Sequence, residues 1–283
     1  MSRLADRFAE LKRAHRTALI PFLTAGDPGP DATVDFMHAL VAAGADAIEL
    51  GVPFTDPMAD GPVIQAACER ALAHGTSLRD VLGMVERFRE RDIDTPVVLM
   101  GYFNPIDSMG LEAFGERARA VGADGVLIVD MTAEEAPDIA PRLVEAGVDP
   151  VCLIAPTTGE ARIGQICENA AGFIYYVSFK GVTGASSLDT DSLAAQIAPI
   201  RRATDLPIGV GFGVRTPDNA AAVAAVADAV IVGSALVREI AEHGDAPATA
   251  AEKLGETLAA MRAAIDRADE KQRDEREQEG ESI

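Results

Sequence analysis

An acidic residue lies within a short apolar segment early in the chain. Between Asp46 and Leu50, Glu49 is flanked by the large apolar residues Ile48 and Leu50. Successive side chains of a β-strand point to opposite faces, so Glu49 points to the face opposite that of Ile48 and Leu50. If those two residues pack against helices, Glu49 points into the interior of the sheet near the end of its strand. We predict a role for Glu49 in catalysis or ligand binding.

A second acid follows in the loop after this strand. The loop at 52–62 contains three prolines and two acids, Asp56 and Asp60. A pair of carboxyl groups can carry out general acid–base chemistry. Asp60, however, also stands just before an expected helix, where an aspartate often caps the helix. The residues by themselves leave both interpretations open.

Two glycine-bearing turns near the end of the chain are suited to an anion. One contains Gly211 and Gly213, and the other contains Gly233 and Ser234. Glycine lets backbone N–H groups approach a phosphate, and the loops after the last two strands of an α/β barrel are its usual phosphate site. We predict phosphate binding there, and a third glycine-bearing loop at 181–185 could close over the ligand.

A lysine near these loops suggests a different chemistry. An aldolase can use a lysine to form a Schiff base, and Lys180 follows one of the expected strands. If Tyr175 and Val177 face inward, however, the alternation of side chains turns Lys180 away from the ligand. The pattern favours paired carboxyl groups over a Schiff base.

The elements that must position these residues alternate along the chain. Short β-branched runs alternate with longer amphipathic runs, a pattern typical of parallel βα units. We expect strands at 18–23, 47–51, 97–101, 125–129, 151–154, 173–178, 207–211 and 229–232, and helices that include 32–43, 78–90, 111–121, 133–146, 192–202 and 217–226. This order predicts an α/β protein with a single (β/α)8 TIM barrel, and an extra N-terminal helix at 4–14 that could close its lower end. Three turns with a glycine two residues before an aspartate, at 44–46, 122–124 and 147–149, are expected at that lower end.

The barrel is expected to form one domain at 1–266. Residues 267–283 are rich in charged residues and contain almost no apolar ones. We expect them to form a charged tail that is either a solvated helix end or disordered.

Composition excludes several classes of function. The formal net charge of -20 disfavours binding to nucleic acid or to anionic membranes. No run approaches the ~18 apolar residues of a membrane span, and the N-terminus lacks the pattern of a secretory signal, so we expect a cytoplasmic protein. The cysteines Cys68, Cys152 and Cys167 are expected to be buried thiols, and the scattered histidines predict no metal site.

Several longer phrases of the sequence resemble the α subunit of tryptophan synthase. They are 21–28 (PFLTAGDP), 49–54 (ELGVPF), 56–65 (DPMADGPVIQ), 99–105 (LMGYFNP) and 181–184 (GVTG). The phrases occur in the family's order, and the resemblance extends from about residue 7 to residue 265.

The resemblance implies retro-aldol cleavage of indole-3-glycerol phosphate to indole and glyceraldehyde 3-phosphate in tryptophan biosynthesis. It implies that Glu49 moves protons, that Asp60 accepts the indole N–H and that Tyr175 lies near the glycerol chain. It further implies an indole slot formed by Phe22, Met100, Leu127 and Phe212, and phosphate contacts from Gly184, Gly213, Gly233 and Ser234. The chemistry is consistent, because an apolar barrel mouth should raise the pKa of Glu49 and a protonated indole ring can accept the electrons of the breaking bond.

The resemblance also implies a partner, a β subunit that holds pyridoxal phosphate in an α2β2 complex, whereas this subunit has no cofactor. Pro53, Asp56 and Asn104 resemble the contact surface, and indole would pass between the subunits through a tunnel. Two places depart from the family's pattern, 130–132 (DMT) and 179–180 (FK). A phosphate-binding docking or regulatory subunit is the alternative, and the presence of both Glu49 and Asp60 favours the lyase.

The acid surplus and the scarcity of lysine suggest a high-salt cytoplasm as a further hypothesis. If it holds, the free energy of unfolding should rise with salt concentration, because added ions screen the mutual repulsion of the acids. Denaturant unfolding at a series of salt concentrations measures this. Full stability in dilute buffer would contradict the hypothesis.

Overall fold

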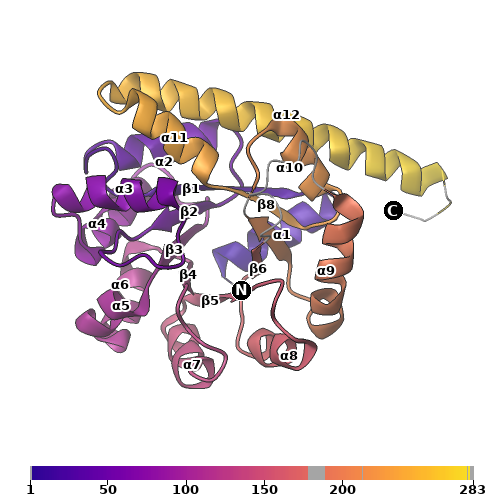
Figure 1. Ribbon diagram of the computed structural model, residues 1–283, viewed down its shortest axis with the longest axis horizontal. Coiled ribbons are helices and arrows are strands. Elements are labelled where there is room, and N and C mark those ends of the chain that lie inside the picture. The colour runs from indigo at the N-terminus through magenta and orange to yellow at the C-terminus, as the bar shows by residue number, and fades with distance from the viewer. Residues whose placement is uncertain (1, 178–188, 212, 279, 281–283) are drawn as a thin grey trace.

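Eight parallel strands close into a barrel in the computed structural model of this chain, which describes residues 2–177, 189–211, 213–278 and 280 (Figure 1). The strands follow one another around the barrel, and β1 also pairs with β8. They are β1 (Ala18–Thr24), β2 (Ile48–Gly51), β3 (Val97–Gly101), β4 (Gly125–Ile128), β5 (Asp149–Ile154), β6 (Ile174–Val177), β7 (Ile208–Gly211) and β8 (Ala229–Val232). All eight predicted strands are confirmed.

Helices surround the barrel on its outer side (Figure 1). They are α1 (Arg3–Arg13), α2 (Thr33–Ala42), α3 (Pro62–Ala73), α4 (Leu78–Arg89), α5 (Phe103–Met109), α6 (Leu111–Val121), α7 (Ala136–Ala146), α8 (Glu160–Glu168), α9 (Thr190–Ala203), α10 (Pro217–Ala224), α11 (Ser234–His243) and α12 (Pro247–Gln278). Among the described residues, no helix is both long and apolar enough to cross a membrane.

The alternation of side chains along each strand separates two apolar layers. Ile48 and Leu50 belong to the layer between the strands and the helices. The interior of the barrel holds a different set, Ala18, Ile20, Ala47, Val98, Leu127, Val151, Phe173, Tyr175, Val177, Ala229 and Ile231. Glu49 therefore points to the interior, as its position between Ile48 and Leu50 predicted.

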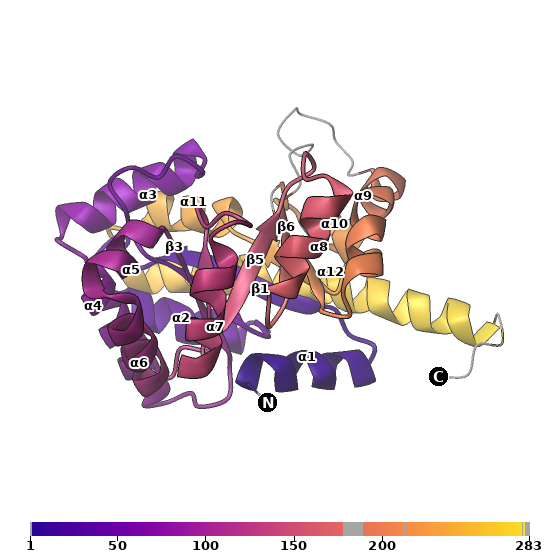
Figure 2. The ribbon, with the colours of Figure 1, turned by 90° about the horizontal axis from the view of Figure 1, so that it is seen from below.

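Helix α1 closes the lower end of the barrel (Figure 2). Its buried residues Leu4, Phe8 and Leu11 join the apolar cluster of the barrel interior. The rings of Phe8 and Phe173 lie 5.6 Å apart. The predicted N-terminal helix and its place are confirmed.

Glycine ends several helices at this lower end. Gly122 and Gly147 cap α6 and α7 in the left-handed conformation, and Gly44 after α2 has a φ of 100°. These are the positions predicted from the Gly-Ala-Asp and Gly-Val-Asp turns. A residue with a side chain would be strained there.

Three aspartates at this lower end, two of which follow such turns, bind the backbone of the neighbouring strand. Asp46 Oδ2 accepts the N–H of Leu19 in β1 at 2.9 Å. In the same way Asp124 accepts the N–H of Val97 in β3 at 2.8 Å, and Asp228 accepts that of Ile208 in β7 at 2.9 Å. One carboxyl group thus satisfies a backbone donor at or next to the start of each of these strands.

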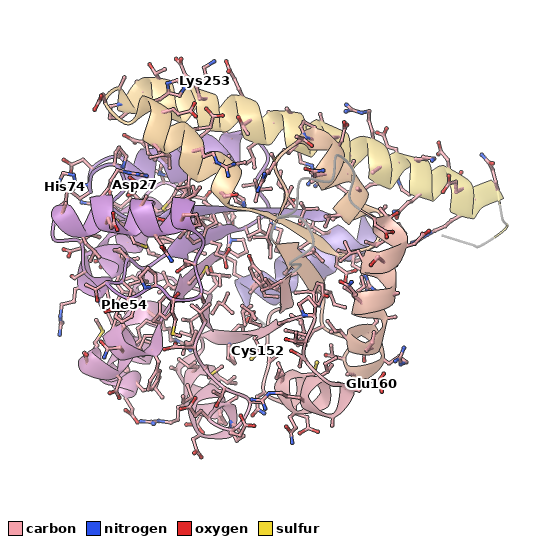
Figure 3. The ribbon with its side chains drawn as sticks, in the orientation of Figure 1. Asp27, Phe54, His74, Cys152, Glu160 and Lys253 are labelled. Carbon is pink, nitrogen blue, oxygen red and sulfur yellow. The ribbon has the colours of Figure 1, made fainter. Side chains whose placement is uncertain are left out.

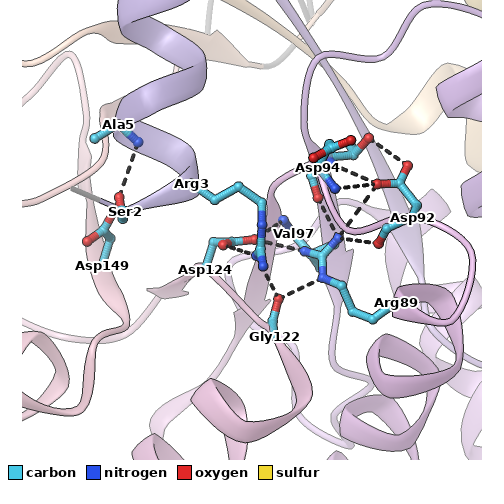
Figure 4. A network of polar contacts seen from close by, with 11 residues as sticks. Ser2, Arg3, Ala5, Arg89, Asp92, Asp94, Val97, Gly122, Asp124 and Asp149 are labelled. Atoms are coloured by element: carbon cyan, nitrogen blue, oxygen red, sulfur yellow. Dashed lines mark hydrogen bonds and ion pairs between the residues drawn. The ribbon is translucent and has the colours of Figure 1, made fainter.

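Each of the three aspartates also pairs with an arginine from a surrounding helix. Arg262 of α12 lies 3.1 Å from Asp46, Arg89 of α4 lies 2.9 Å from Asp124, and Arg201 of α9 lies 3.0 Å from Asp228. Figure 4 shows the Asp124 network, in which Arg3 of α1 also binds this carboxylate. These ion pairs tie the helices to the lower ends of the strands.

The strand pair β5 and β6 lacks this arrangement. Pro150 takes the place in β5 that Leu19, Val97 and Ile208 take in their strands, and proline has no N–H to donate. Its carbonyl accepts the N–H of Ala171 at 2.8 Å. Ala171 therefore stands where the other pairs have their aspartate, and Pro150 offers no N–H that a carboxylate there could accept.

The charged tail is helical as far as Gln278, one of the two forms expected for it, and most of its side chains are exposed. Asp269 is an exception, because it is buried and accepts the N–H of Thr17 at 2.9 Å and its hydroxyl at 2.7 Å. Helix α12 runs without a break across residue 266, so the division at 266 and 267 stays a prediction. The three cysteines are buried and free, as predicted.

Removal of one buried aspartate tests the role of the lower network. We expect Asp124→Ala to lower the free energy of unfolding by about 3–5 kcal/mol, because it leaves Arg89 and the N–H of Val97 without their partner. The matched control Glu86→Ala breaks the exposed pair with Arg117 and should change stability by less than about 1 kcal/mol. Urea unfolding measures both, and equal effects would contradict the assignment.

Candidate active site

Glu49 is an acid buried in the mouth of the barrel. Its side chain lies on β2 between Phe22 of β1 and Val98 of β3 in the strand register, and the residue is 1% exposed. Neither carboxyl oxygen has a hydrogen-bond partner among the described residues. Burial, and secondarily the charge of Asp60, raises the pKa of Glu49 to about 8. Glu49 therefore holds its proton at neutral pH.

Asp60 is the second acid of the site and is less buried. The N-cap residue of α3 is Gly61, and no side chain caps that helix, so the capping interpretation of Asp60 is wrong. Its Oδ2 instead accepts a hydrogen bond from the Tyr102 hydroxyl at 2.9 Å. Burial raises the pKa of Asp60, and the bond from Tyr102 opposes that shift. The two acids thus have different surroundings.

Tyr102 is a site residue that sequence reasoning missed. It follows β3, and its hydroxyl accepts the N–H of Ala59 at 3.0 Å while it donates to Asp60. Its ring stacks on Phe54, with 5.0 Å between centroids. A polar residue directly after a barrel strand is the signal that could have found it.

The hydroxyl of Tyr175 lies near Glu49 and depends on a glycine for its space. Burial, then the charges of Glu49 and Asp60, raises the pKa of Tyr175 well above its usual value. A Cβ on Gly211 would lie 2.2 Å from that hydroxyl, and a Cβ on Gly51 would lie 2.6 Å from the Phe22 ring. Glycines on β7 and β2 therefore leave room for the two aromatic side chains.

The residues predicted to hold an indole ring lie on neighbouring strands. Phe22 and Met100 pack together with Val63, Ile64 and Val237. Leu127 lies beside Met100 in the register of β3 and β4 and belongs to the barrel interior. Phe212 lies outside the described residues. The described members of the set thus form one apolar surface near Glu49.

The predicted phosphate rim includes the start of α11. Gly233 is the N-cap of this helix and Ser234 is its first residue, and both are half-buried. The first N–H groups of a helix have no partner within it and attract an anion. Gly213, after β7, has a φ of +82°, whereas Gly184 lies outside the described residues.

A half-buried ion pair fixes the helix that follows Asp60. Arg70 of α3 binds Asp27 through Nε at 2.7 Å and Nη2 at 2.8 Å. Asp27 follows β1, and its burial raises its pKa while Arg70 lowers it. Figure 3 shows Asp27 and Phe54 on the same side of the barrel. Sequence reasoning gave Asp27 no role, because its partner is 43 residues away.

The residues expected at a subunit contact differ in their exposure. Asp56 and Asn104 are exposed, and Met58 in the same loop as Asp56 is 87% exposed. Pro53 is buried in this chain, so it shapes the loop and its ring is not available at the surface. Among the described residues, one group that could hold a metal ion is Glu239, Glu242 and His243 at the end of α11, but its members are partly or fully exposed.

The raised pKa of Glu49 makes a prediction about stability. The unfolded chain releases this proton near its ordinary pKa of 4.5, whereas the folded protein keeps it until about pH 8. Burial of Glu49 therefore lowers the free energy of unfolding progressively as pH rises between these values. Glutamine stays neutral, so we expect Glu49→Gln to gain up to about 1.4 kcal/mol over the original protein for each pH unit between 5 and 8.

Urea unfolding of both proteins across this pH range measures the gain. The control is Glu69→Gln, which changes an exposed acid on α3 and should show no gain that grows with pH. A stability difference for Glu49→Gln that does not depend on pH would contradict the buried, protonated state.

Known proteins match the chain over nearly all of the described barrel. The family model of the tryptophan synthase alpha chain matches residues 8–266. The tryptophan synthase alpha chain of Thioalkalivibrio sulfidiphilus is 61% identical over 266 residues, which are 94% of this chain and 100% of that protein. The tryptophan synthase alpha chain of Alkalilimnicola ehrlichii is 57% identical over 266 residues, which are 94% of this chain and 97% of that protein.

Solved structures agree. Tryptophan synthase subunit alpha from Legionella pneumophila superposes with a TM-score of 0.88 at 45% identity, over 94% of this chain and 99% of that one. A chain of tryptophan synthase from Mycobacterium tuberculosis superposes with a TM-score of 0.82 at 33% identity, over 94% of this chain and 100% of that one. The chain belongs to the tryptophan synthase alpha chain family, the lyases that cleave indole-3-glycerol phosphate in tryptophan biosynthesis.

Proposed function

We propose that Glu49 and Asp60 carry out the cleavage of indole-3-glycerol phosphate to indole and glyceraldehyde 3-phosphate in this chain. The observation that carries the proposal is the buried carboxyl group of Glu49, whose oxygens have no partner among the described residues and whose pKa is raised to about 8. A group that holds a proton near neutral pH and can release it is suited to acid–base catalysis.

Glu49 first acts as the acid. Its proton goes to C3 of the indole ring, which becomes an indolenine with a C=N⁺ bond. The bond between C3 and the glycerol chain then breaks, and its electron pair restores the aromatic ring. Glu49, now a carboxylate, takes the proton of the adjacent glycerol hydroxyl as the aldehyde forms. Glu49 thus regains a proton for the one that it donated, and it is ready for the next cycle.

Asp60 acts as the ionised partner. It is less buried than Glu49 and receives the hydrogen bond from Tyr102, which favours its carboxylate. An ionised Asp60 that accepts the indole N–H stabilises the positive ring of the intermediate. Two acids with different surroundings thus take the two roles.

The remaining predicted residues hold the substrate. Phe22, Met100 and Leu127 provide an apolar surface for the indole ring, and Tyr175 lies near the glycerol chain. Gly213, Gly233 and Ser234 present backbone N–H groups to the phosphate. Phe212 and Gly184 stay predictions, because they lie outside the described residues.

We further propose that this subunit needs no cofactor, because the protonated indole ring itself accepts the electrons of the breaking bond. The expected partner is a β subunit that holds pyridoxal phosphate, in an α2β2 complex. The exposed side chains of Asp56 and Met58 lie on the loop after β2 that contains Asp60, and that of Asn104 lies at the start of α5, two residues after Tyr102. Docking there would keep apolar indole out of bulk water.

Conservative variants test the carboxyl mechanism. We expect Glu49→Gln to lower kcat by about 10²–10⁴-fold, because it removes the proton donor. Asp60→Asn should lower kcat by about 10²–10³-fold, because it removes the charge that stabilises the ring. Indole release from indole-3-glycerol phosphate measures both.

The exposed acid Glu69 on α3 again provides the control, and Glu69→Gln should keep the original turnover. Unchanged turnover in both Glu49→Gln and Asp60→Asn would refute the mechanism. Such a result would favour a docking or regulatory subunit.

A further inference from the structure

A large cleft lies at the lower end of the barrel, opposite the strand ends that carry the active site. Its volume is about 770 Å³, within the range of small-molecule sites. The walls come from α1, from residues 15–17, from the turns before β7 and β8, and from the end of α12. Figure 2 shows α1 beneath the barrel and the end of α12 extending past it.

The charge of this cleft is opposite to that of the whole chain. Its permanent cations are Lys12, Arg16, Arg201, Arg273 and Arg276, and its acids are Asp205, Asp228 and Asp269. The chain as a whole has 25 Lys and Arg against 45 Asp and Glu. A concave surface with a cationic excess in an acidic protein concentrates anions.

Several cations of the cleft are not neutralised by the protein. Asp228 pairs with Arg201, and Asp269 lies 3.6 Å from Arg262, which does not line the cleft. Within the described part of the chain, Lys12, Arg273 and Arg276 have no ion pair. These three cations come from α1 and α12, so they face a ligand from two elements.

The backbone at the end of α1 supports a role for the cleft. His15 has a φ of 51°, the one positive value at a non-glycine residue of the described chain. The N–H of Arg16, the residue after His15, donates to the carbonyl oxygen of Leu11 at 2.9 Å. This bond places His15 at the position just after the helix where glycine is common. Residues with a side chain rarely adopt this conformation, and the side chain of His15 lines the cleft.

One wall of the cleft is apolar. It includes Leu206 and Pro207 before β7 and Ala224 to Ala227 before β8. A ligand that fits the whole cleft can therefore carry an uncharged part beside its charged groups.

We propose that this cleft binds a small molecule with two or more linked phosphate groups. Three unpaired cations on two elements favour a ligand with more than one negative charge. A guanidinium group can bind two phosphate oxygens at once through two parallel N–H groups. Arg273 and Arg276 are three residues apart and share a face of α12. Both lie beyond residue 266, where the family match ends.

Histidine resonances report this site directly. Of the four histidines, all in the described part of the chain, His15 is the one that lines the cleft. The full chain is titrated with pyrophosphate, and separately with ADP, at constant ionic strength while the ring resonances are followed by NMR. We expect either ligand to move the His15 resonance in a saturable way, and sulfate at equal ionic strength to leave it in place.

Variants of α12 locate the binding. The double variant Arg273→Ala, Arg276→Ala should weaken pyrophosphate binding at least about 10-fold, since each lost charge-assisted contact contributes on the order of 1.5–3 kcal/mol. Arg267→Ala changes an exposed arginine of the same helix outside the cleft and should bind as the original chain does. Tighter binding of ADP than of pyrophosphate would identify a nucleotide that uses the apolar wall, and the reverse would identify a free condensed phosphate.

The proposal is overturned if neither ligand moves His15, or if the double variant binds as tightly as Arg267→Ala. Phosphate binding at the active-site rim does not produce the expected result, because that rim is at the other end of the barrel. Indole release by the same variants should stay unchanged, so failure here leaves the carboxyl mechanism intact.

Discussion

A carboxyl group with no hydrogen-bond partner among the described residues, enclosed by apolar side chains, is the constraint on which the rest of the site depends. Burial of Glu49 is unfavourable for its charged form, so the group keeps its proton at pH values where an exposed glutamate has lost it. That state requires the strand parity that turns Ile48 and Leu50 outward. It also requires Gly51 and Gly211, which leave room for Phe22 and Tyr175.

The two ends of the barrel differ: the lower end is held by ion pairs and hydrogen bonds, and the candidate active site lies at the upper end. At the lower end, Asp46, Asp124 and Asp228 accept strand N–H groups and pair with helix arginines. At the upper end, neither carboxyl oxygen of Glu49 has a hydrogen-bond partner within the described chain, which is unfavourable for folding. The ion pairs and hydrogen bonds of the lower end offset this loss of folding free energy. In this fold the lower end generally contributes to stability.

The contrast between Glu49 and Asp60 arises from their elements. Glu49 sits within a strand, so the barrel wall encloses it. Asp60 sits at the end of a loop, where Tyr102 can reach it and solvent is closer. The loop is held in place by the stacking of Phe54 on Tyr102 and by the Asp27–Arg70 pair, which anchors α3. The different surroundings of the two acids therefore depend on the fold as much as on the two residues.

The sequence by itself determined the barrel, its strands, the inward direction of Glu49 and the glycine-ended turns, because these depend on local alternation and helix-end preferences. The long phrases it shares with a known family are the basis of the predicted site residues, which stay predictions. Only the tertiary structure showed that Asp60 binds Tyr102 and does not cap α3, that Arg70 holds Asp27, and that α1 and the end of α12 form a cationic cleft. Those features join residues far apart in the chain, and the spacing of residues along a sequence does not specify which distant side chains meet.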